Sequence, residues 1–428
     1  MQILIKNGRV IDPEQKVNKI SDILIERGKI TRIAPSIKAK ADKTIDAKGK
    51  IVAPGFIDMH AHLREPGQED KETIETGLTA AAAGGFTNVA AMPNTEPACD
   101  NQAQVKFLLN KASDARKGKI IPICAITKNR EGKELTEMAE LKDAGCPAVS
   151  DDGDSVSDAA LMRRALEYAS MLDMVVISHC EDKALAENGV MHEGYWSTVL
   201  GLAPIPAEAE MNIVKRDIQL AELADARLHI AHISTKGSVE LVKEAKKKGI
   251  KVTAEVTPHH LTLKDEDLKT YDTNLKVNPP LRSAGDVKAL KEGLKDGTID
   301  AIATDHAPHL ENEKEKEFDY APFGMIGFET ALPLAAMKLI DEKYLDWTKL
   351  IEKFSTNPAK ILGCEGGTLK EGKAADVVII DPEKEWVYEK KLIKSRSSNS
   401  PFIGWKLKGA VTDLLVDGRI VVKDGEVV

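Results

Sequence analysis

The chain has few cysteines and no paired ones. Five of its 428 residues are cysteine, and no two of them form a CxxC pair. An odd, scattered set excludes a disulfide framework and a site of four thiolates, and it indicates a reducing compartment. We therefore expect a cytoplasmic protein.

Long apolar runs and basic stripes are also missing. No apolar stretch approaches the ~20 residues that cross a bilayer, and the first ten residues alternate in polarity, unlike a signal peptide. The net charge is -8 and the pI about 5.8. These features favour a soluble globular protein and argue against membrane and nucleic-acid partners.

Short strand patterns separated by turn signals occupy both ends of the chain. The turn signals are Asn7-Gly8, Arg27-Gly28, Asp417-Gly418 and Asp424-Gly425. Asn-Gly and Asp-Gly pairs between apolar runs are typical of β-hairpins. We expect residues 1–54 and 364–428 to form one small β-sandwich domain, with a catalytic domain of residues 55–363 inserted between them.

The central region alternates apolar strand patterns with amphipathic helical patterns. The predicted strands are Phe56–Met59, Thr87–Ala91, Ile120–Ile126, Pro147–Ser150, Met174–Ser178, Leu228–Ala231, Lys251–Val256 and Ile299–Thr304. Eight such repeats over about 300 residues predict an α/β fold of the (β/α)8 TIM barrel type. A doubly wound open sheet is the weaker alternative, because no GxGxxG follows the first strand.

Histidine and aspartate follow the predicted ends of five of these strands. They are His60 and His62 after the first strand, Asp151 and Asp152 after the fourth, His179 after the fifth, His232 after the sixth, and Asp305, His306 and His309 after the eighth. Each one alone has an ordinary structural explanation, as a buried histidine or a helix cap. Since the chain has only ten histidines, that explanation is poor for five strands together. Barrel enzymes carry their reactive groups at these strand ends.

These residue types suit a divalent metal. His60 and His62 are two positions apart, so both imidazoles point to the same side of a strand. Imidazoles combined with carboxylates are ligands of Zn²⁺ or a similar ion, and the set is large enough for two ions that share a carboxylate. A P-loop is absent. The sequence therefore predicts metal-assisted hydrolysis or its reverse.

Six short motifs resemble those of a known family. They are "PGFIDMHAHLREPG", "MPNTEP", "HCED", "HIS", "KVNPPLR" and "IATDHAPH". Together with "NPAKILG", "GTLKEGKAADVVIID" and "SSNSPFIGW", they resemble the bacterial type I branch of dihydroorotase in the amidohydrolase superfamily. The resemblance covers nearly the whole chain. The HxHLREPG string combined with "MPNT" is specific to that branch, whereas HxH alone indicates only the superfamily.

The resemblance implies a role for ten residues. His60, His62 and Asp305 would bind one Zn²⁺, His179 and His232 a second, and Asp152 would bridge the two; occupancy by one or two ions stays open. Asp305 would also be the general acid/base. Arg64, Asn94 and His309 would hold the free carboxylate of the substrate, and Asn278 would contact its ring.

The implied reaction is the reversible cyclisation of N-carbamoyl-L-aspartate to L-dihydroorotate, a step of pyrimidine (UMP) biosynthesis. In the hydrolytic direction, metal-bound hydroxide would attack the ring amide and Asp305 would carry its proton to the departing nitrogen. The resemblance also implies association with aspartate transcarbamoylase and assembly into a homo-oligomer or a hetero-complex.

Two other functions stay open. One is a related cyclic-amide hydrolase: a dihydropyrimidinase, hydantoinase or allantoinase. Those relatives typically carry a carboxylated lysine at strand four, and no lysine lies near that position here. The other is a non-catalytic scaffold for aspartate transcarbamoylase, which would be expected to lose metal residues that this chain keeps.

The stretch "VSDDGDS" (149–155) holds three aspartates in four positions. We expect Asp152 to be the ligand, Asp151 to face away, and Asp154 to lie in a loop before a helix capped by Ser157. Strand alternation should also turn Cys180 away from the metal. The charged segment 310–324 follows the last strand and is a candidate lid.

Overall fold

Eight parallel strands follow one another around a central barrel. The structure is a computed structural model that describes residues 1–428. The strands are β6 (Phe56–Ala61), β7 (Phe86–Ala91), β8 (Lys119–Cys124), β9 (Ala148–Val149), β10 (Val175–Ser178), β13 (Arg227–Ile230), β14 (Val252–Val256) and β15 (Ala301–Ile302). Each pairs with its neighbours in this order. All eight lie at the positions predicted from the sequence.

The barrel closes between its first strand and the segment after its last. The backbone N–H of Asp305 donates to the carbonyl of His60 at 3.0 Å, and the N–H of His62 donates to the carbonyl of His306 at 2.9 Å. Strand β15 is short, so these bonds extend the pairing beyond it. Closure therefore brings residues from the two ends of the central region side by side.

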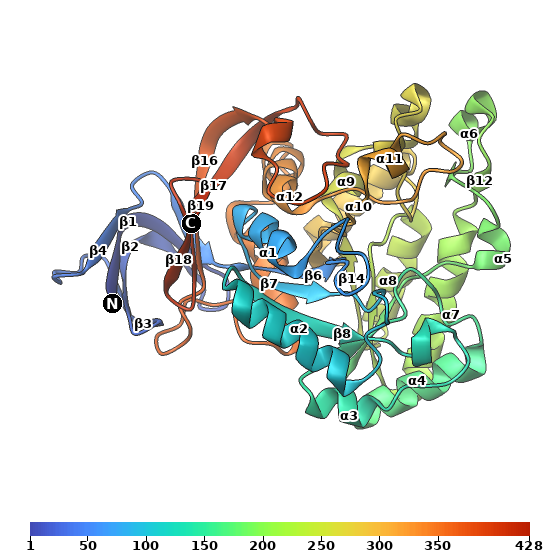
Figure 1. The fold of residues 1–428 in the computed structure, drawn as a ribbon, viewed down its shortest axis with the longest axis horizontal. Coiled ribbons are helices and arrows are strands. Elements are labelled where there is room, and N and C mark those ends of the chain that lie inside the picture. The colour runs from blue at the N-terminus through green and yellow to red at the C-terminus, as the bar shows by residue number, and fades with distance from the viewer.

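Helices cover the outside of the barrel (Figure 1). They are α1 (Ile74–Ala83), α2 (Gln102–Ala115), α3 (Met138–Asp143), α4 (Ala159–Met171), α7 (Glu208–Ala224), α8 (Lys236–Lys247), α10 (Ala284–Asp296) and α12 (Phe328–Ala335). In α8 the buried residues Val239, Val242 and Ala245 recur every three positions, which places them on one face against the barrel. The Thr235 side chain caps this helix by accepting from the N–H of Ser238.

Short elements lie between these helices and strands. They are α5 (Lys183–Ala186), β11 (Met191–His192), α6 (Tyr195–Leu200), β12 (Pro204–Ile205), α9 (Pro258–Thr262), α11 (Glu311–Lys314), α13 (Trp347–Ile351) and α14 (Asn357–Leu362). None of the helices combines the length and the apolar character that crossing a membrane requires.

Strands from both ends of the chain form a second sheet, seen as neighbouring blue and red strands in Figure 1. They are β1 (Gln2–Asp12), β2 (Val17–Glu26), β3 (Lys29–Ala34), β4 (Lys43–Asp46), β5 (Ile51–Pro54), β16 (Val377–Val387), β17 (Lys406–Val416), β18 (Arg419–Lys423) and β19 (Glu426–Val427). Antiparallel pairing of β5 with β16 joins the two halves, and Ile3, Ile23 and Val377 are buried in their common core. The expected β domain of both termini is present; its limits at residues 54 and 364 stay a prediction.

The Asn7-Gly8 signal does not form a hairpin turn. Strand β1 continues through it, with a shift of register between Ile5 and Gly8. Asn7 adopts a left-handed conformation (φ 62°), and its N–H donates to Asp22. β1 therefore has one extra residue here relative to β2, which pairs with it on both sides, and this arrangement is a β-bulge. The turn itself lies at residues 13–16, whereas the three other turn signals are confirmed between their strands.

Four phenylalanines pack together at the barrel wall. Phe56 and Phe86 lie at the beginnings of β6 and β7, Phe328 begins α12, and Phe354 follows α13. Phe354 stacks on Phe56 with ring centroids 5.0 Å apart and meets Phe86 edge-on at 6.0 Å. Phe328 lies 5.7 Å from Phe86. All four side chains are fully buried.

We expect Phe354→Ala to lower the free energy of unfolding by about 3–5 kcal/mol, because it leaves a cavity that rings on two barrel strands line. Thermal unfolding of the variant checks this. Met171→Ala is the control, since Met171 is 82% exposed and its loss should cost less than about 0.5 kcal/mol. Equal midpoints for the two variants would contradict the packing role of Phe354.

Candidate metal centre and substrate pocket

Barrel closure places His60, His62 and Asp305 in one cluster. The Nε2 atom of His62 lies 3.0 Å from Oδ1 of Asp305, and Nε2 of His60 lies 3.8 Å from the same oxygen. All three side chains are buried. Asp305 holds a left-handed backbone conformation, with φ 48°, of the kind that concentrates at functional sites.

Asp152 lies between this cluster and a second pair of histidines. Its Oδ1 is 3.1 Å from Nε2 of His60 and 3.7 Å from both Nδ1 of His179 and Nε2 of His232. Its Oδ2 is 3.5 Å from Nε2 of His62. The two facing nitrogens of His179 and His232 are 3.0 Å apart. One carboxylate is therefore within reach of both histidine pairs.

The donor set fits a metal ion. Ligands bound tetrahedrally at 2.0–2.2 Å are about 3.3–3.6 Å apart, close to the separations above. In two groups the donor atoms all lie within 4.8 Å of one another: His60 with Asp152 and His232, and His60 with His62 and Asp305. The Nε2 of His60 and Oδ1 of Asp152 are buried and have no hydrogen-bond partner, which is costly unless a cation is bound.

Electrostatics in the cluster keep its carboxyls ionised. Burial disfavours their ionisation, but the histidines outweigh it and lower the pKa of Asp152 and of Asp305 below the ordinary value. Ionised carboxylates are the form that binds metal.

Two side chains hold the His60 and His62 rings. The Nδ1 of His60 donates to Oε1 of Glu255 at 3.0 Å, and Nδ1 of His62 lies 2.9 Å from the amide oxygen of Asn94. Because a carboxylate or amide oxygen only accepts, each Nδ1 carries the proton and each Nε2 keeps a free lone pair. Such partners orient ligands in metal proteins.

Glu255 is a residue that sequence reasoning missed. It lies within β14, fully buried, and its Oε2 is 3.2 Å from Nε2 of His229. Burial opposes its ionisation, but hydrogen bonds from His229 and His60 lower the pKa of Glu255 to about 2. An acidic residue in an otherwise apolar buried strand was the signal that could have identified it.

The three aspartates of 151–154 have separate roles. Asp152 faces the histidines, whereas Asp151 accepts hydrogen bonds from the N–H groups of Ile126 and Thr127 and so faces away, as expected. Gly153, directly after Asp152, adopts the left-handed conformation (φ 81°) that glycine allows, and the chain turns there.

Asp154 is in a loop, as predicted, and pairs with Arg130 at 2.6 Å. The cap of α4 was predicted one residue too early. Asp158, not Ser157, accepts from the N–H groups of Ala160 and Leu161. Serine and aspartate both form helix N-caps. Because α4 begins at Ala159, the residue directly before it, Asp158, is the cap.

A pocket of about 360 Å³ opens above the cluster and brings the predicted substrate residues together. It is lined by His62, Arg64, Asn94, Asp152, Gly153, His179, His232, Asn278, Asp305, Ala307, His309, Pro322, Phe323 and Gly324. All ten site residues proposed from the sequence except His60 are in this set, and His60 lies behind Asp152. Pro322, Phe323 and Gly324 end the segment predicted to be a lid; its mobility stays a prediction.

Arg64 and His309 contact one another in the lining of this pocket. The Nη2 of Arg64 is 3.2 Å from Nε2 of His309, and its Nε donates to the carbonyl of Pro308. Burial lowers the pKa of Arg64 to about 10, so it stays cationic at neutral pH. Burial, and then the charge of Arg64, lowers the pKa of His309 to about 2, so His309 is neutral. One fixed cation beside a neutral ring is suited to a carboxylate.

Asn94 and Asn278 each make a contact that the sequence did not indicate. The amide oxygen of Asn94 is committed to His62, and the amide nitrogen of Asn278 donates to Glu181 at 3.1 Å. Glu181 in turn lies 3.7 Å from Nε2 of His179. Both asparagines therefore connect the pocket wall with the histidine cluster.

His306, Cys180 and His260 lie outside the cluster. His306 turns away, with Nε2 3.3 Å from Glu72. The Cys180 thiol contacts Ser178 instead of the histidines, as strand alternation predicts. His260 is held between Thr257 and the carbonyl of Pro279, consistent with a structural role.

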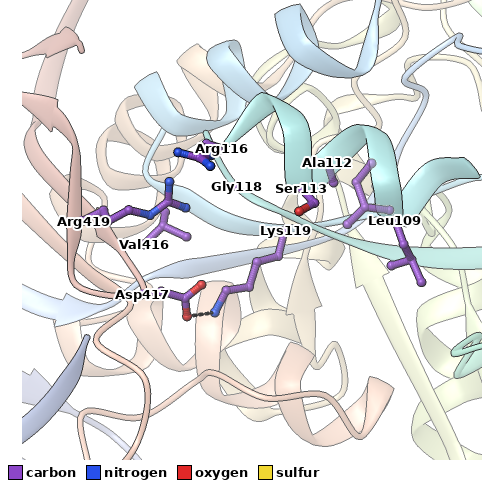
Figure 2. A pocket seen from close by; sticks show the side chains of 10 residues that line it. Leu109, Ala112, Ser113, Arg116, Gly118, Lys119, Val416, Asp417 and Arg419 are labelled. Atoms are coloured by element: carbon purple, nitrogen blue, oxygen red, sulfur yellow. Dashed lines mark ion pairs between the residues drawn. The ribbon is translucent and has the colours of Figure 1, made fainter. Parts of the chain in front are cut away.

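A second hollow, of about 500 Å³, lies at the end of α2 against β17 and β18 (Figure 2). Lys119 projects into it and pairs with Asp417 at 2.6 Å and with Asp376 at 2.8 Å. This hollow lies at the beginning of β8, whereas the histidine cluster lies beyond the ends of the strands. The lining of the hollow contains no histidine. The chemistry therefore belongs to the smaller pocket.

Two family models match the chain, in parts that overlap. A dihydro-orotase-like model matches residues 49–238, and an amidohydrolase family model matches residues 222–428. Among solved structures, the fold is similar to the L-hydantoinase (dihydropyrimidinase) from Arthrobacter aurescens, with a TM-score of 0.90 and 26% identity over 100% of this chain and 97% of that one. The dihydropyrimidinase from Brevibacillus agri NCHU1002 gives a TM-score of 0.88 and 25% identity over 100% and 96%.

Curated relatives are more similar in sequence than these structures. The dihydroorotase of Acetivibrio thermocellus is 54% identical over 422 residues, which are 99% of each chain. The dihydroorotase of Geotalea daltonii is 53% identical over 424 residues, covering 99% of this chain and all of that protein. Full-length identity at this level agrees with the barrel and with the cluster of histidines and aspartates at its rim. The chain belongs to the dihydroorotase family of amidohydrolases.

Proposed function

We propose that this protein catalyses the reversible cyclisation of N-carbamoyl-L-aspartate to L-dihydroorotate, with the ten site residues in the roles named above. The observation that carries the proposal is the pairing of Arg64 with His309 directly above the histidine–aspartate cluster. This arrangement offers one place for a free carboxylate and, next to it, one for hydrolysis of an amide. L-dihydroorotate has that combination of groups, and N-carbamoyl-L-aspartate keeps the free carboxylate.

We propose Zn²⁺ as the cofactor, one or two ions per subunit. His60, His62 and Asp305 would hold one ion, His179 and His232 the other, and Asp152 would be shared. When bound, the metal lowers the pKa of a coordinated water to about 7 and polarises a carbonyl oxygen.

The side chains of the protein would then orient the substrate and move one proton. Arg64, Asn94 and His309 would hold the carboxylate, and Asn278 the ring, so that the amide carbonyl lies over Asp152. Asp305 would take the proton of the attacking water and deliver it to the ring nitrogen as the amide bond breaks. Cyclisation runs these steps in reverse and starts with Asp305 protonated. Protonation of Asp305 becomes more frequent as the pH falls, so cyclisation should gain relative to hydrolysis in that direction.

The alternatives have less support. Curated relatives at 53–54% identity carry the name dihydroorotase, whereas the hydantoinase and dihydropyrimidinase structures match at about half that identity. Residues at the end of β9 include aspartates and no lysine, so a carboxylated lysine has no place there. A scaffold without activity would have no need for a complete ligand set. Association with aspartate transcarbamoylase, oligomer formation and a cytoplasmic location remain proposals; the five free cysteines agree with the last.

We expect the zinc-loaded protein to hydrolyse L-dihydroorotate, and to hydrolyse hydantoin and dihydrouracil more slowly by a factor of at least about 10², because neither of these offers Arg64 a carboxylate. Steady-state assays alongside metal analysis measure this. A preference for hydantoin would favour the cyclic-amide hydrolase alternative. Full metal loading without any activity would favour the scaffold, or an enzyme that needs its partner; repeating the assay with aspartate transcarbamoylase separates these two.

Asp305→Asn should lower kcat by about 10³-fold or more, because the amide cannot accept the proton. The variant keeps the shape of the side chain, so we expect it to retain part of its metal. Turnover near that of the unsubstituted enzyme in a metal-loaded variant would remove Asp305 from the proposed role.

Asp152→Ala should lower zinc content, because it removes the one carboxylate within reach of both histidine pairs. Inductively coupled plasma mass spectrometry of protein purified with zinc measures the ratio of metal to protein. Asp154→Ala is the matched control, since Asp154 lies in the same stretch and pairs with Arg130 outside the cluster. Unchanged metal content in Asp152→Ala would show that Asp152 is not a ligand.

A further inference from the structure

The motif "SSNSPFIGW" has no role in the site described so far. It lies between β16 and β17, in the part of the chain assigned to the terminal domain. Its Asn399 is 4% exposed and reaches into the barrel rim. The residues that this side chain contacts belong to the loop after β15, about 75 to 90 positions earlier in the sequence.

All hydrogen-bonding atoms of the Asn399 side chain are engaged with this loop. Its Oδ1 accepts from the backbone N–H of His309 at 3.0 Å. Its Nδ2 donates to the carbonyls of Ala307 at 3.0 Å and of Gly324 at 3.2 Å. Its backbone carbonyl also accepts from the N–H of Ile326 at 3.0 Å. One side chain thus joins the two ends of the loop 307–326.

The loop carries groups that line the substrate pocket. His309 faces Arg64, and Ala307 and Gly324 line the same cavity. The bond to the His309 N–H fixes the backbone from which the imidazole projects. Movement of this backbone would change the 3.2 Å separation between Arg64 and His309.

The segment that holds Asn399 is itself anchored by the carboxyl groups of two residues, the buried Glu72 and the half-buried Glu329. Glu329 accepts from the N–H groups of Lys394 and Ser395 at 2.5 and 3.3 Å. Glu72 accepts from the N–H of Arg396 at 3.0 Å and from the hydroxyl of Ser395. The hydrogen bonds to the ionised Glu72 are charge-assisted and therefore among the strong ones, and with those to Glu329 they make this segment a fixed support.

We propose that Asn399 is a positioning residue: it holds His309 against Arg64 and so sets the affinity for the substrate carboxylate. The inference rests on the proposed function, because it concerns the carboxylate of dihydroorotate. It makes the terminal domain part of substrate recognition, although that domain contributes no side chain to the lining of the pocket.

The test compares Asn399→Ala with Ser397→Ala. Ser397 lies in the same segment and donates to the carbonyl of Lys71, so its loss removes a hydrogen bond without touching the loop 307–326. We expect Asn399→Ala to raise KM for L-dihydroorotate by about tenfold to a hundredfold, with a much smaller change in kcat and unchanged zinc content. Ser397→Ala should leave KM unchanged.

A double-mutant cycle with His309→Ala separates positioning from general stability. If Asn399 acts through His309, then Asn399→Ala added to His309→Ala should change KM by less than about twofold. A full, additive effect in that background would overturn the inference, as would an unchanged KM in the single variant.

Asn399→Asp provides the same test without a cavity. It keeps the shape of the side chain and the acceptor for the His309 N–H, and it loses both donors to the loop. We expect a raised KM here too, so the test survives if the alanine variant does not fold. If the unsubstituted enzyme hydrolyses dihydroorotate and these variants have the same KM as it does, this inference alone is overturned. No hydrolysis by the unsubstituted enzyme overturns the proposed function, and the inference with it.

Discussion

Two backbone hydrogen bonds between the first strand of the barrel and the segment after the last one hold the site together. They join Asp305 to His60 and His62 to His306. Each bond links a residue of the cluster to a position about 245 residues away, so the cluster exists only in the closed barrel. A parallel barrel gathers the carboxyl ends of its strands at one rim, and the other aspartate and histidines of the cluster follow the fourth, fifth and sixth strands at that rim.

The buried charges at this rim are organised in layers around the cluster. Asp152 and Asp305 face the histidines, and Glu255 and Asn94 hold two of the rings from behind. Removing charges from water is costly unless each has a partner, and here every carboxylate has a histidine, a hydroxyl or an N–H group beside it. Further out, Asn399 fixes the loop that carries His309. The terminal domain and the barrel are thereby connected at the pocket.

Much of the fold and of the site could be predicted from the sequence, because both depend on local periodicity. The period of two in a strand placed His60 and His62 together, and the parallel barrel placed Asp152, His179, His232 and Asp305 near them. Other features depend on distant contacts and could not be predicted. Glu255 acts through His60, 195 positions away, and Asn399 through His309, 90 positions away. At Asn7-Gly8 the local turn signal was overridden, because β2 continues to pair on both sides of it.

The central claim is that one carboxylate, Asp152, lies between two pairs of histidines that bind metal. Anomalous diffraction at the zinc edge, from crystals of the zinc-loaded protein, tests it directly. We expect at least one anomalous peak within about 2.0–2.2 Å of an Asp152 oxygen and of ring nitrogens from His60 and His62 or from His179 and His232. Peaks confined to other parts of the molecule, or an Asp152 side chain turned away from every peak, would contradict it.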